Sequence, residues 1–251
     1  MKKVHDHFSD RSESYKKYRP SYPQELYSEI LKFVKTKDSC WDCGTGNGQV
    51  AIELSKYFTK VIATDISQNQ LNSAERRKNI VYKKVRAEQT GFQSDQFDLI
   101  TVAQAIHWFD FEEFQREVIR VAKNGAVLGI WGYGLIEIEA PINNLINLFY
   151  KDIIGPYWNV ERKHIDNRYN SIPFSFKQLN KDDEIVIKEN WNLNQLEGYL
   201  NTWSGVKNYM VDHDGKNPVK DLISNLRKEW RANEKKEIRF PIFLKVGRIE
   251  K

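Results

Sequence analysis

The chain is poor in the residues that build metal centres and disulfide frameworks. Its 251 residues include only two cysteines and five histidines. Cys40 and Cys43 form a C-x-x-C without a second pair, and both lie on what should be the first buried strand. Buried, reduced thiols are therefore favoured over a redox or metal role. No histidine stands at metal-ligand spacing from acids or cysteines, so the sequence predicts no bound metal.

Long apolar segments are also missing. No run reaches 18 apolar residues, and the first residues, Met-Lys-Lys-Val-His-Asp, are polar and carry no apolar h-region. With the reduced cysteines, this leads us to expect a cytoplasmic protein without a membrane partner. Hydrophobic residues still make up 40% of the chain and aromatic residues 13%, which is enough to fill a sizeable core.

The net charge of the chain is also small. The 39 basic residues outnumber the 34 acidic ones only slightly, which gives a net charge of +5, and lysine is spread along the chain. A solvated surface is therefore favoured over a nucleic-acid footprint, and we expect no nucleic-acid partner. The sequence leaves the oligomeric state open.

Strands and helices alternate through the first half. Helical spacing of apolar residues predicts helices over residues 50–58, 67–78 and 111–122, with Ser67 as an N-cap and Asn124-Gly125 as a helix break. Short apolar, β-branched segments predict strands over residues 39–43, 60–65, 80–85, 97–102 and 126–131. This alternation indicates an α/β, Rossmann-like, doubly wound sheet that is mostly parallel.

After the fifth strand the pattern changes. We expect helices at 141–154, 193–203 and 218–230, and strands at 184–188 and 237–246, where Pro241 suggests an edge or a bulge. The sheet would then have seven strands and a helical insertion after strand five, which could roof a ligand pocket. We interpret the chain as one domain with four parts: an N-terminal cap (1–35), a cofactor-binding core (36–134), the insertion (135–183) and C-terminal strands and helices (184–251).

The main functional signal is a glycine loop followed by an acid. Asp42-Cys43-Gly44-Thr45-Gly46-Asn47-Gly48 leaves the first strand, and Asp65 ends the second strand, 23 residues after Asp42. Glycines let a backbone turn sharply and approach a ligand, and a carboxylate one strand away can accept hydrogen bonds from both ribose hydroxyls. The pattern therefore predicts a nucleoside site and disfavours a tight turn without a ligand.

The loop also indicates which nucleoside. A dinucleotide fingerprint, G-x-G-x-x-G, would place its third glycine at position 49, which is Gln49. An acid that opens the loop would repel a pyrophosphate, whereas it suits a ligand with a cationic end. S-adenosylmethionine has an ammonium group and a sulfonium and lacks phosphate, so it is favoured over a dinucleotide.

These residues resemble the class I S-adenosylmethionine-dependent methyltransferases, with Ala87-Glu88 after the third strand as a further match. Two segments, Tyr15-Lys16-Lys17-Tyr18-Arg19-Pro20-Ser21-Tyr22-Pro23 and Ala103-Gln104-Ala105-Ile106-His107-Trp108-Phe109-Asp110, together with Thr202-Trp203-Ser204, resemble its small-molecule branch, which includes trans-aconitate methyltransferases. The resemblance implies that the cofactor-binding residues are Asp42, Gly44, Gly46, Asp65, Ile66, Ala87, Glu88, Gln104, Tyr15 and Arg19.

The acceptor side rests on aromatic residues and one histidine. Methyl transfer needs mainly alignment and a dry pocket, and a carboxylate acceptor needs no base. A hydroxyl or amine acceptor does need a base, and the candidate is His107, just past strand four. The alternative is that His107 only forms a hydrogen bond with a backbone carbonyl at the strand tip. We expect aromatic side chains to line the space around the sulfonium and the substrate, namely Tyr18, Tyr22, Trp108 and Trp203. For each of them, packing in the core is the alternative.

We therefore expect an enzyme that methylates a small molecule, with a carboxylate as the candidate acceptor. A nucleic-acid or protein methyltransferase would need a basic groove with stacking aromatics, and here the basic charge is diffuse. A non-catalytic cofactor-binding protein stays open on sequence alone. A nicotinamide oxidoreductase is disfavoured by Gln49 and by Asp42.

Overall fold

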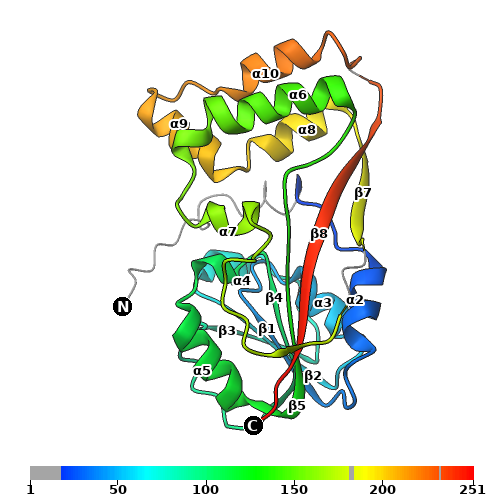
Figure 1. The fold of residues 1–251 in the computed structure, drawn as a ribbon, viewed down its shortest axis with the longest axis vertical. Helices are drawn as coiled ribbons and strands as arrows, with labels where there is room; N and C mark the ends of the chain where they lie inside the picture. Colours follow the sequence, from blue (N-terminus) through cyan, green and yellow to red (C-terminus); the bar gives the residue numbers. More distant parts are fainter. Residues whose placement is uncertain (1–17, 181–183, 232) are drawn as a thin grey trace.

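The computed structural model describes residues 18–180, 184–231 and 233–251, and arranges them as a sheet with a helical layer above it (Figure 1). The strand order is β3-β2-β1-β4-β5-β8-β6, and β7 also pairs with β8. The first five strands are parallel, and β8 is antiparallel to its three partners. The strands are β1 (Ser39–Cys43), β2 (Lys60–Asp65), β3 (Ile80–Lys84), β4 (Phe97–Ala103), β5 (Ala122–Tyr133), β6 (Lys177–Gln178), β7 (Val186–Trp191) and β8 (Lys236–Arg248).

The Rossmann-like α/β fold predicted from the alternation is confirmed, but the sheet has eight strands rather than seven. The additional strand, β6, has two residues, both exposed, so it carries no periodic signal. β5 starts at Ala122, directly after helix α5, so Asn124-Gly125 lies inside the strand and does not break the helix. Pro241 lies where β8 changes its partner from β5 to β7, and the strand is paired on both sides of this point.

Helices cover both faces of the sheet because successive side chains of each strand point to opposite faces. Cys40 and Leu99 belong to a core cluster with α2 and α3, whereas Trp41 and Ile100 belong to a second cluster with α5. The helices beside the sheet are α2 (Gln24–Leu31), α3 (Gln49–Leu54), α4 (Gln68–Asn72), which Ser67 caps as predicted, and α5 (Phe111–Val121).

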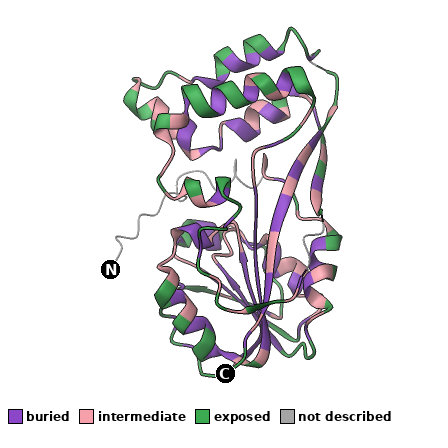
Figure 2. Cartoon of the chain, viewed as in Figure 1, coloured by how far each residue is buried: buried purple, intermediate pink, exposed green. Residues whose placement is uncertain are grey.

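The helical layer contains more of the C-terminal segment than the sequence indicates. It is built from α6 (Ala140–Leu148), α8 (Leu193–Leu200), α9 (Ser204–Asp212) and α10 (Val219–Leu226), with short helices η3 (Phe149–Ile153) and η4 (Gly155–Tyr157). In Figure 2 the buried residues of these helices face one another and β8. Below the layer, α7 (Arg162–Asp166) brings the chain down to the upper edge of the sheet (Figure 1).

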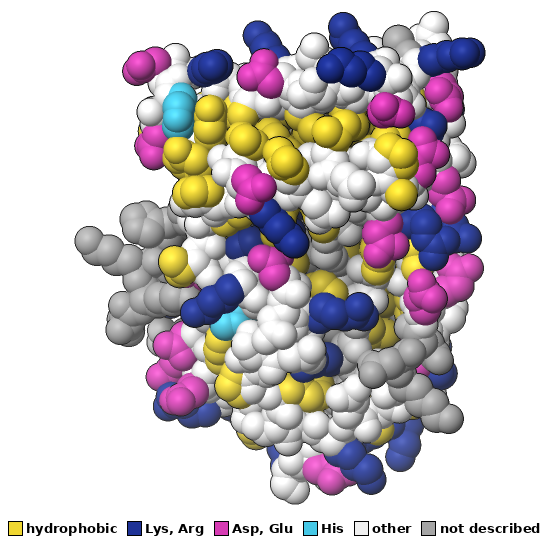
Figure 3. All heavy atoms as spheres, turned by 45° about the horizontal axis from the view of Figure 1, so that its top comes forward, with side chains coloured by type: hydrophobic (Ala, Val, Ile, Leu, Met, Phe, Trp, Pro, Cys, Tyr) yellow, Lys and Arg dark blue, Asp and Glu magenta, His cyan; other side chains and the backbone are white. Residues whose placement is uncertain are grey.

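The outer face of the helical layer mixes side-chain types. Figure 3 shows hydrophobic side chains gathered over the layer, and the exposed large ones include Leu148 and Val211. Lysines and arginines alternate with acids on the same face (Figure 3). Within the described residues, every helix is too short or too polar to span a lipid bilayer.

Candidate functional site

A cavity of about 370 Å³ opens at the carboxyl ends of the parallel strands. Ligands bind at this edge in doubly wound folds because the loops that leave neighbouring strands diverge there. The cavity is lined by Arg19, Pro20, Tyr22, Asp42, Cys43, Gly44, Thr45, Gly46, Asn47, Gln49, Val50, Thr64, Asp65, Ile66, Gln70, Val85, Arg86, Ala87, Glu88, Ala103, Gln104, Ala105, Trp108, Phe109, Tyr133, Asn159 and Glu161.

The glycine loop forms the floor of the cavity and fits tightly against its neighbours. Gly44 has φ +69° and Gly48 has φ +85°, a region that favours glycine. A Cβ at Gly44 would lie 2.6 Å from Cβ of Ala105, and one at Gly48 would lie 2.5 Å from the Tyr82 hydroxyl. Gly46, with φ +55°, has nothing closer than Gln70 at 3.9 Å, so its Cα faces open space. The loop, called the glycine cradle below, therefore excludes side chains at Gly44 and Gly48 and leaves open space at Gly46.

Asp65 lies at the end of β2 with a fixed carboxylate. One oxygen accepts a 2.8 Å hydrogen bond from the backbone N–H of Gly46, and the other accepts a 2.9 Å bond from that of Ser67. Each carboxylate oxygen can accept more than one hydrogen bond, so these contacts orient the group toward the cavity without excluding a ligand hydroxyl. The sequence placed Asp65 next to the glycine loop, and the structure brings the two together.

Asp42 ends up almost completely buried beneath the loop. Its carboxylate accepts a hydrogen bond from the Thr45 hydroxyl and a 2.9 Å bond from the Thr101 hydroxyl. Burial raises the pKa of Asp42 to about 6, although the bonds from the two threonines lower it. A buried acid with a raised pKa is a group that a nearby cation would stabilise in its charged form.

This raised pKa predicts a pH-dependent stability. Because the folded pKa of about 6 lies above 3.8, the ordinary value of an aspartate carboxyl, the folded state holds this proton more tightly than the unfolded chain does. The free energy of unfolding should therefore fall, by about 3 kcal/mol in total, as the pH rises from below about 4 to above about 6. Denaturant unfolding of the wild type and of Asp42→Asn checks this. Asn cannot ionise, so an equal slope in both proteins would contradict the assignment.

The segment after β3 supplies the next wall of the cavity. Ala87 is buried, and Glu88 accepts a 3.0 Å hydrogen bond from the backbone N–H of Asp110 and lies 3.3 Å from Nε of Arg86. Ile66, at the end of β2, completes this side. These residues line the cavity beside Asp65, where the resemblance places the adenine.

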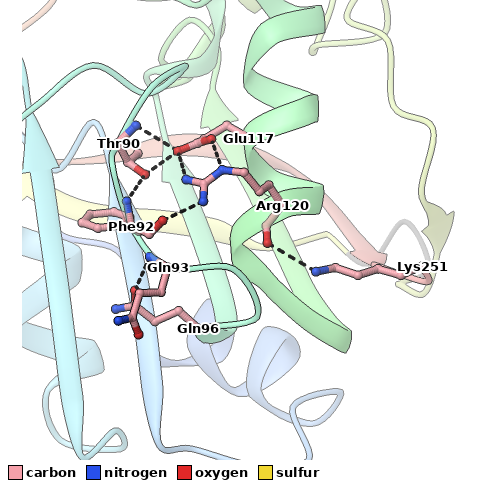
Figure 4. Close-up of polar contacts among 7 residues, drawn as sticks. All are labelled: Thr90, Phe92, Gln93, Gln96, Glu117, Arg120 and Lys251. Atoms are coloured by element: carbon pink, nitrogen blue, oxygen red, sulfur yellow. Dashed lines mark hydrogen bonds and ion pairs between the residues drawn. The ribbon is translucent and has the colours of Figure 1, made fainter.

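A partly buried network of hydrogen bonds holds this segment against α5 (Figure 4). Glu117 accepts hydrogen bonds from the Thr90 hydroxyl and from its N–H, the latter at 2.9 Å. Arg120 donates two 2.8 Å bonds to Glu117 and a 2.6 Å bond to the carbonyl of Phe92. The chain that carries Ala87 and Glu88 is thereby fixed to a helix of the core.

Gln104 lies at the tip of β4, as predicted, in an unusual conformation. Its φ is +52°, and its side-chain amide pairs with the backbone of Tyr133, with N–H to Oε1 at 3.0 Å and Nε2 to the carbonyl at 3.2 Å. The amide thus continues the pairing of β4 with β5 beyond the strand ends. This contact fixes Tyr133, a cavity residue that carries no sequence motif and that sequence reasoning missed.

The upper side of the cavity comes from distant parts of the chain. Arg19 and Tyr22, from the N-terminal segment, and Trp108, after β4, line it as the sequence suggests. Asn159 and Glu161 line it from the inserted segment between η4 and α7, and no sequence pattern pointed to either. Tyr15, which was also assigned to the cofactor, lies outside the described residues.

Three predicted site residues do not line the cavity. Tyr18 packs its ring on α8, where a Cβ at Gly198 would lie 2.3 Å from the ring. Trp203 is buried inside the helical layer against Phe149 and Tyr150, with ring centroids 6.4 Å and 5.8 Å away. Each of these two side chains packs in or against the core of the layer, and their role in substrate binding stays a prediction.

His107 is the third. Its ring is buried, and its Nδ1 lies 3.0 Å from the hydroxyl of Tyr169. Of the short helix η2 (Ile106–Trp108), only Trp108 reaches the cavity lining. The candidate base is therefore buried beside Tyr169 and absent from the cavity lining, and its catalytic role stays a prediction.

We expect His107→Ala to act on stability. Removing a buried ring and a hydrogen bond should lower the free energy of unfolding by about 2–4 kcal/mol. Turnover of the folded fraction should change less than about tenfold. Denaturant unfolding and steady-state kinetics measure the two effects. Tyr169→Phe, which removes only the hydroxyl, should lose about 1–2 kcal/mol. A stable His107→Ala protein with a large loss of turnover would instead support a catalytic role for His107.

Metal binding and thiol chemistry are two alternatives for this site. The described part of the chain holds no group of three or more His, Cys, Asp or Glu residues placed to bind a metal ion. Cys40 and Cys43 are buried in β1 as expected, and burial raises the pKa of both thiols well above its ordinary value. Neither thiol is therefore a ready nucleophile.

Comparison with known proteins gives a consistent result. A family model described as a methyltransferase domain matches residues 41–130. A protein of Dictyostelium discoideum named as a methyltransferase is 34% identical over 258 residues, covering 99% of this chain and 97% of that protein. A Saccharomyces cerevisiae protein named as an S-adenosylmethionine-dependent methyltransferase is 27% identical over 255 residues, with 87% of each covered.

A solved structure extends the likeness to three dimensions. It is described as a type II methyltransferase from Anaeromyxobacter dehalogenans, and it superposes with a TM-score of 0.85 at 31% identity, over 93% of this chain and 99% of that one. The similarity thus covers the helical layer as well as the sheet. Because it runs through nearly the whole chain and includes the strands that carry the glycine cradle, this chain belongs to the class I S-adenosylmethionine-dependent methyltransferases.

Proposed function

We propose that this protein transfers the methyl group of S-adenosylmethionine to a small-molecule carboxylate. The observation that carries the proposal is the lining of the cavity, which combines the glycine loop with residues 19–22 of the N-terminal segment and with Asn159 and Glu161 of the insertion. Its volume of about 370 Å³ lies within the range of small-molecule pockets, and because the cofactor would take up part of this space, only a small acceptor would fit beside it. A polymer substrate would need an open groove instead.

The residues of the cradle fit the cofactor. The loop lines the cavity from Gly44 to Asn47, and a Cβ at Gly46 would meet little but open space. Asp65 would hold the ribose hydroxyls, Asp42 would stabilise the cationic methionine end through the loop above it, and Ile66, Ala87 and Glu88 would enclose the adenine. When bound, the cofactor supplies an electrophilic methyl group on a sulfonium. The thioether that leaves needs no protonation.

The lining favours an acceptor that arrives as an anion. The described residues that line the cavity include no histidine, the side chain that most often removes a proton from an acceptor. Of the carboxylates that line it, Asp42, Asp65 and Glu88 are assigned to the cofactor, which leaves Glu161. A carboxylate is already ionised and needs only alignment and partial desolvation. The resemblance of the N-terminal and strand-four segments to trans-aconitate methyltransferases supports the same class of acceptor.

A product-detected screen tests the proposal. The purified protein would be incubated with methyl-labelled S-adenosylmethionine and a panel of di- and tricarboxylic acids, phenols and amines. We expect a product that releases labelled methanol in mild alkali, because methyl esters hydrolyse under these conditions whereas ethers and amines do not. Label in alkali-stable products, or in added RNA or protein, would contradict the proposed acceptor.

A further inference from the structure

The two ends of the cavity are chemically different. Asp65 and Glu88 lie at the ends of β2 and β3, whereas Tyr133 lies at the end of β5. In the strand order, β1 and β4 separate β2 from β5. With strands about 4.8 Å apart, the β5 end lies about 14 Å along the sheet from the expected ribose site. The cationic side chain at this end is Arg19, whereas Arg86, which also lines the cavity, is paired with Glu88 at the other end.

Arg19 is held on two sides by residues far away in the sequence. Its Nη1 donates a 2.6 Å hydrogen bond to the Tyr133 hydroxyl, across 114 residues. Its guanidinium carbon lies 5.7 Å from the centre of the Tyr199 ring on α8. A hydrogen bond fixes one edge of the guanidinium and the aromatic ring supports its face, so the orientation of the fork is set before a ligand binds.

The support behind Tyr133 is itself rigid. The Gln104 amide bonds both the N–H and the carbonyl of Tyr133, and the Tyr133 ring meets Phe240 of β8 edge to face at 5.4 Å. Tyr133 is buried, yet it still reaches the cavity lining. A tyrosine fixed through both its backbone and its ring can position another side chain precisely enough to matter for a ligand.

We propose that Arg19 is the carboxylate-binding residue of this cavity and that Tyr133 is its positioning residue. A guanidinium presents N–H groups in a planar fork that matches a carboxylate, and the bond is stronger in a site that largely excludes water. Two carboxylates can reach the β5 end: that of the acceptor and that of the methionine part of the cofactor. The first source rests on the proposed function, and the second does not.

Calorimetry separates the sources on the cofactor side. The probes are S-adenosylhomocysteine, which carries the amino-acid end, and 5′-methylthioadenosine, which lacks it. They would be titrated into the wild type, Arg19→Gln and Tyr133→Phe, with Arg116→Gln, an exposed arginine of α5, as the matched control. If Arg19 binds the acceptor, both probes should keep their affinity within about threefold in all variants. If it binds the cofactor, only S-adenosylhomocysteine should lose about tenfold or more.

Kinetics give the acceptor side. With an acid that the wild type methylates, Arg19→Gln should raise KM about tenfold or more and reduce the preference for the acid over its monoamide. Tyr133→Phe should raise KM less, with little change in kcat, whereas a purely structural role would lower thermal stability and leave this preference intact. If no acid is methylated, the proposed function fails, but calorimetry still tests whether Arg19 binds the carboxylate of the cofactor. Unchanged affinity for both probes together with unchanged or absent acid methylation would overturn the assignment.

Discussion

Replacing Asp65 by alanine should weaken S-adenosylhomocysteine binding by about 100-fold. The carboxylate is expected to accept hydrogen bonds from both ribose hydroxyls, and bonds to a charged group contribute about 1.5–3 kcal/mol each, so a net loss of about 3 kcal/mol is reasonable. The same carboxylate also holds Gly46 and Ser67 by their backbone N–H groups. Its loss would therefore loosen the cradle as well as remove the ribose contacts. Isothermal titration calorimetry measures the effect.

Two control variants test whether the loss of affinity is specific to the carboxylate of Asp65. Asp65→Asn keeps an oxygen that can accept one backbone hydrogen bond, so its affinity should fall between those of the wild type and the alanine variant. Asp221→Ala removes an exposed acid on α10 and should bind like the wild type. A change of less than about threefold in the Asp65→Ala protein would show that the ribose is held elsewhere.

The second large effect should come from Gly44→Ala. The backbone at Gly44 has φ +69°, and the added Cβ would lie 2.6 Å from Cβ of Ala105, so conformational strain and overlap add. Strain costs about 1–2 kcal/mol and overpacking a further 1–3 kcal/mol, which gives a loss of about 2–5 kcal/mol in unfolding free energy. Because Ala105 lies in the cavity wall, cofactor affinity should fall too. Denaturant unfolding and calorimetry measure the two losses.

Gly91→Ala separates the two causes. Gly91 has nearly the same backbone angle, φ +68°, but a Cβ there would have nothing within 4 Å. It should lose only the strain, about 1–2 kcal/mol, and bind the cofactor normally. If Gly44→Ala and Gly91→Ala lost equal stability and both kept cofactor affinity, the close approach of the loop to Ala105 would have no energetic role.

The cofactor end of the site could be read from the sequence because its determinants are local. Gly44 and Gly48 are required by backbone angles within one loop, and Asp65 follows directly from the register of two neighbouring strands. The alternation of strand and helix patterns likewise predicted the first five strands and their mostly parallel sheet. Local sterics and periodicity are the properties that a single sequence displays most directly.

The acceptor end could not be read in the same way. Tyr133 closes β5 without any motif, and its partner Arg19 lies 114 residues earlier, so only the folded chain brings them together. His107 and Trp108 show the same limit at short range. Both follow β4, but the single turn of η2 sends Trp108 to the cavity and His107 into the core beside Tyr169. A strand tip indicates where a side chain starts, whereas its direction depends on the turn.

The thirteen-residue strand β8 has a mechanical consequence. Its first half pairs with β7 beside the helical layer, and its second half pairs with β5 in the sheet, without an interruption between them (Figure 1). Tilting the roof relative to the floor would therefore mean flexing a paired ribbon instead of swinging on a loop. Such a joint resists large rotations, so substrates should enter through rearrangement of shorter flanking segments while the two halves keep their spacing.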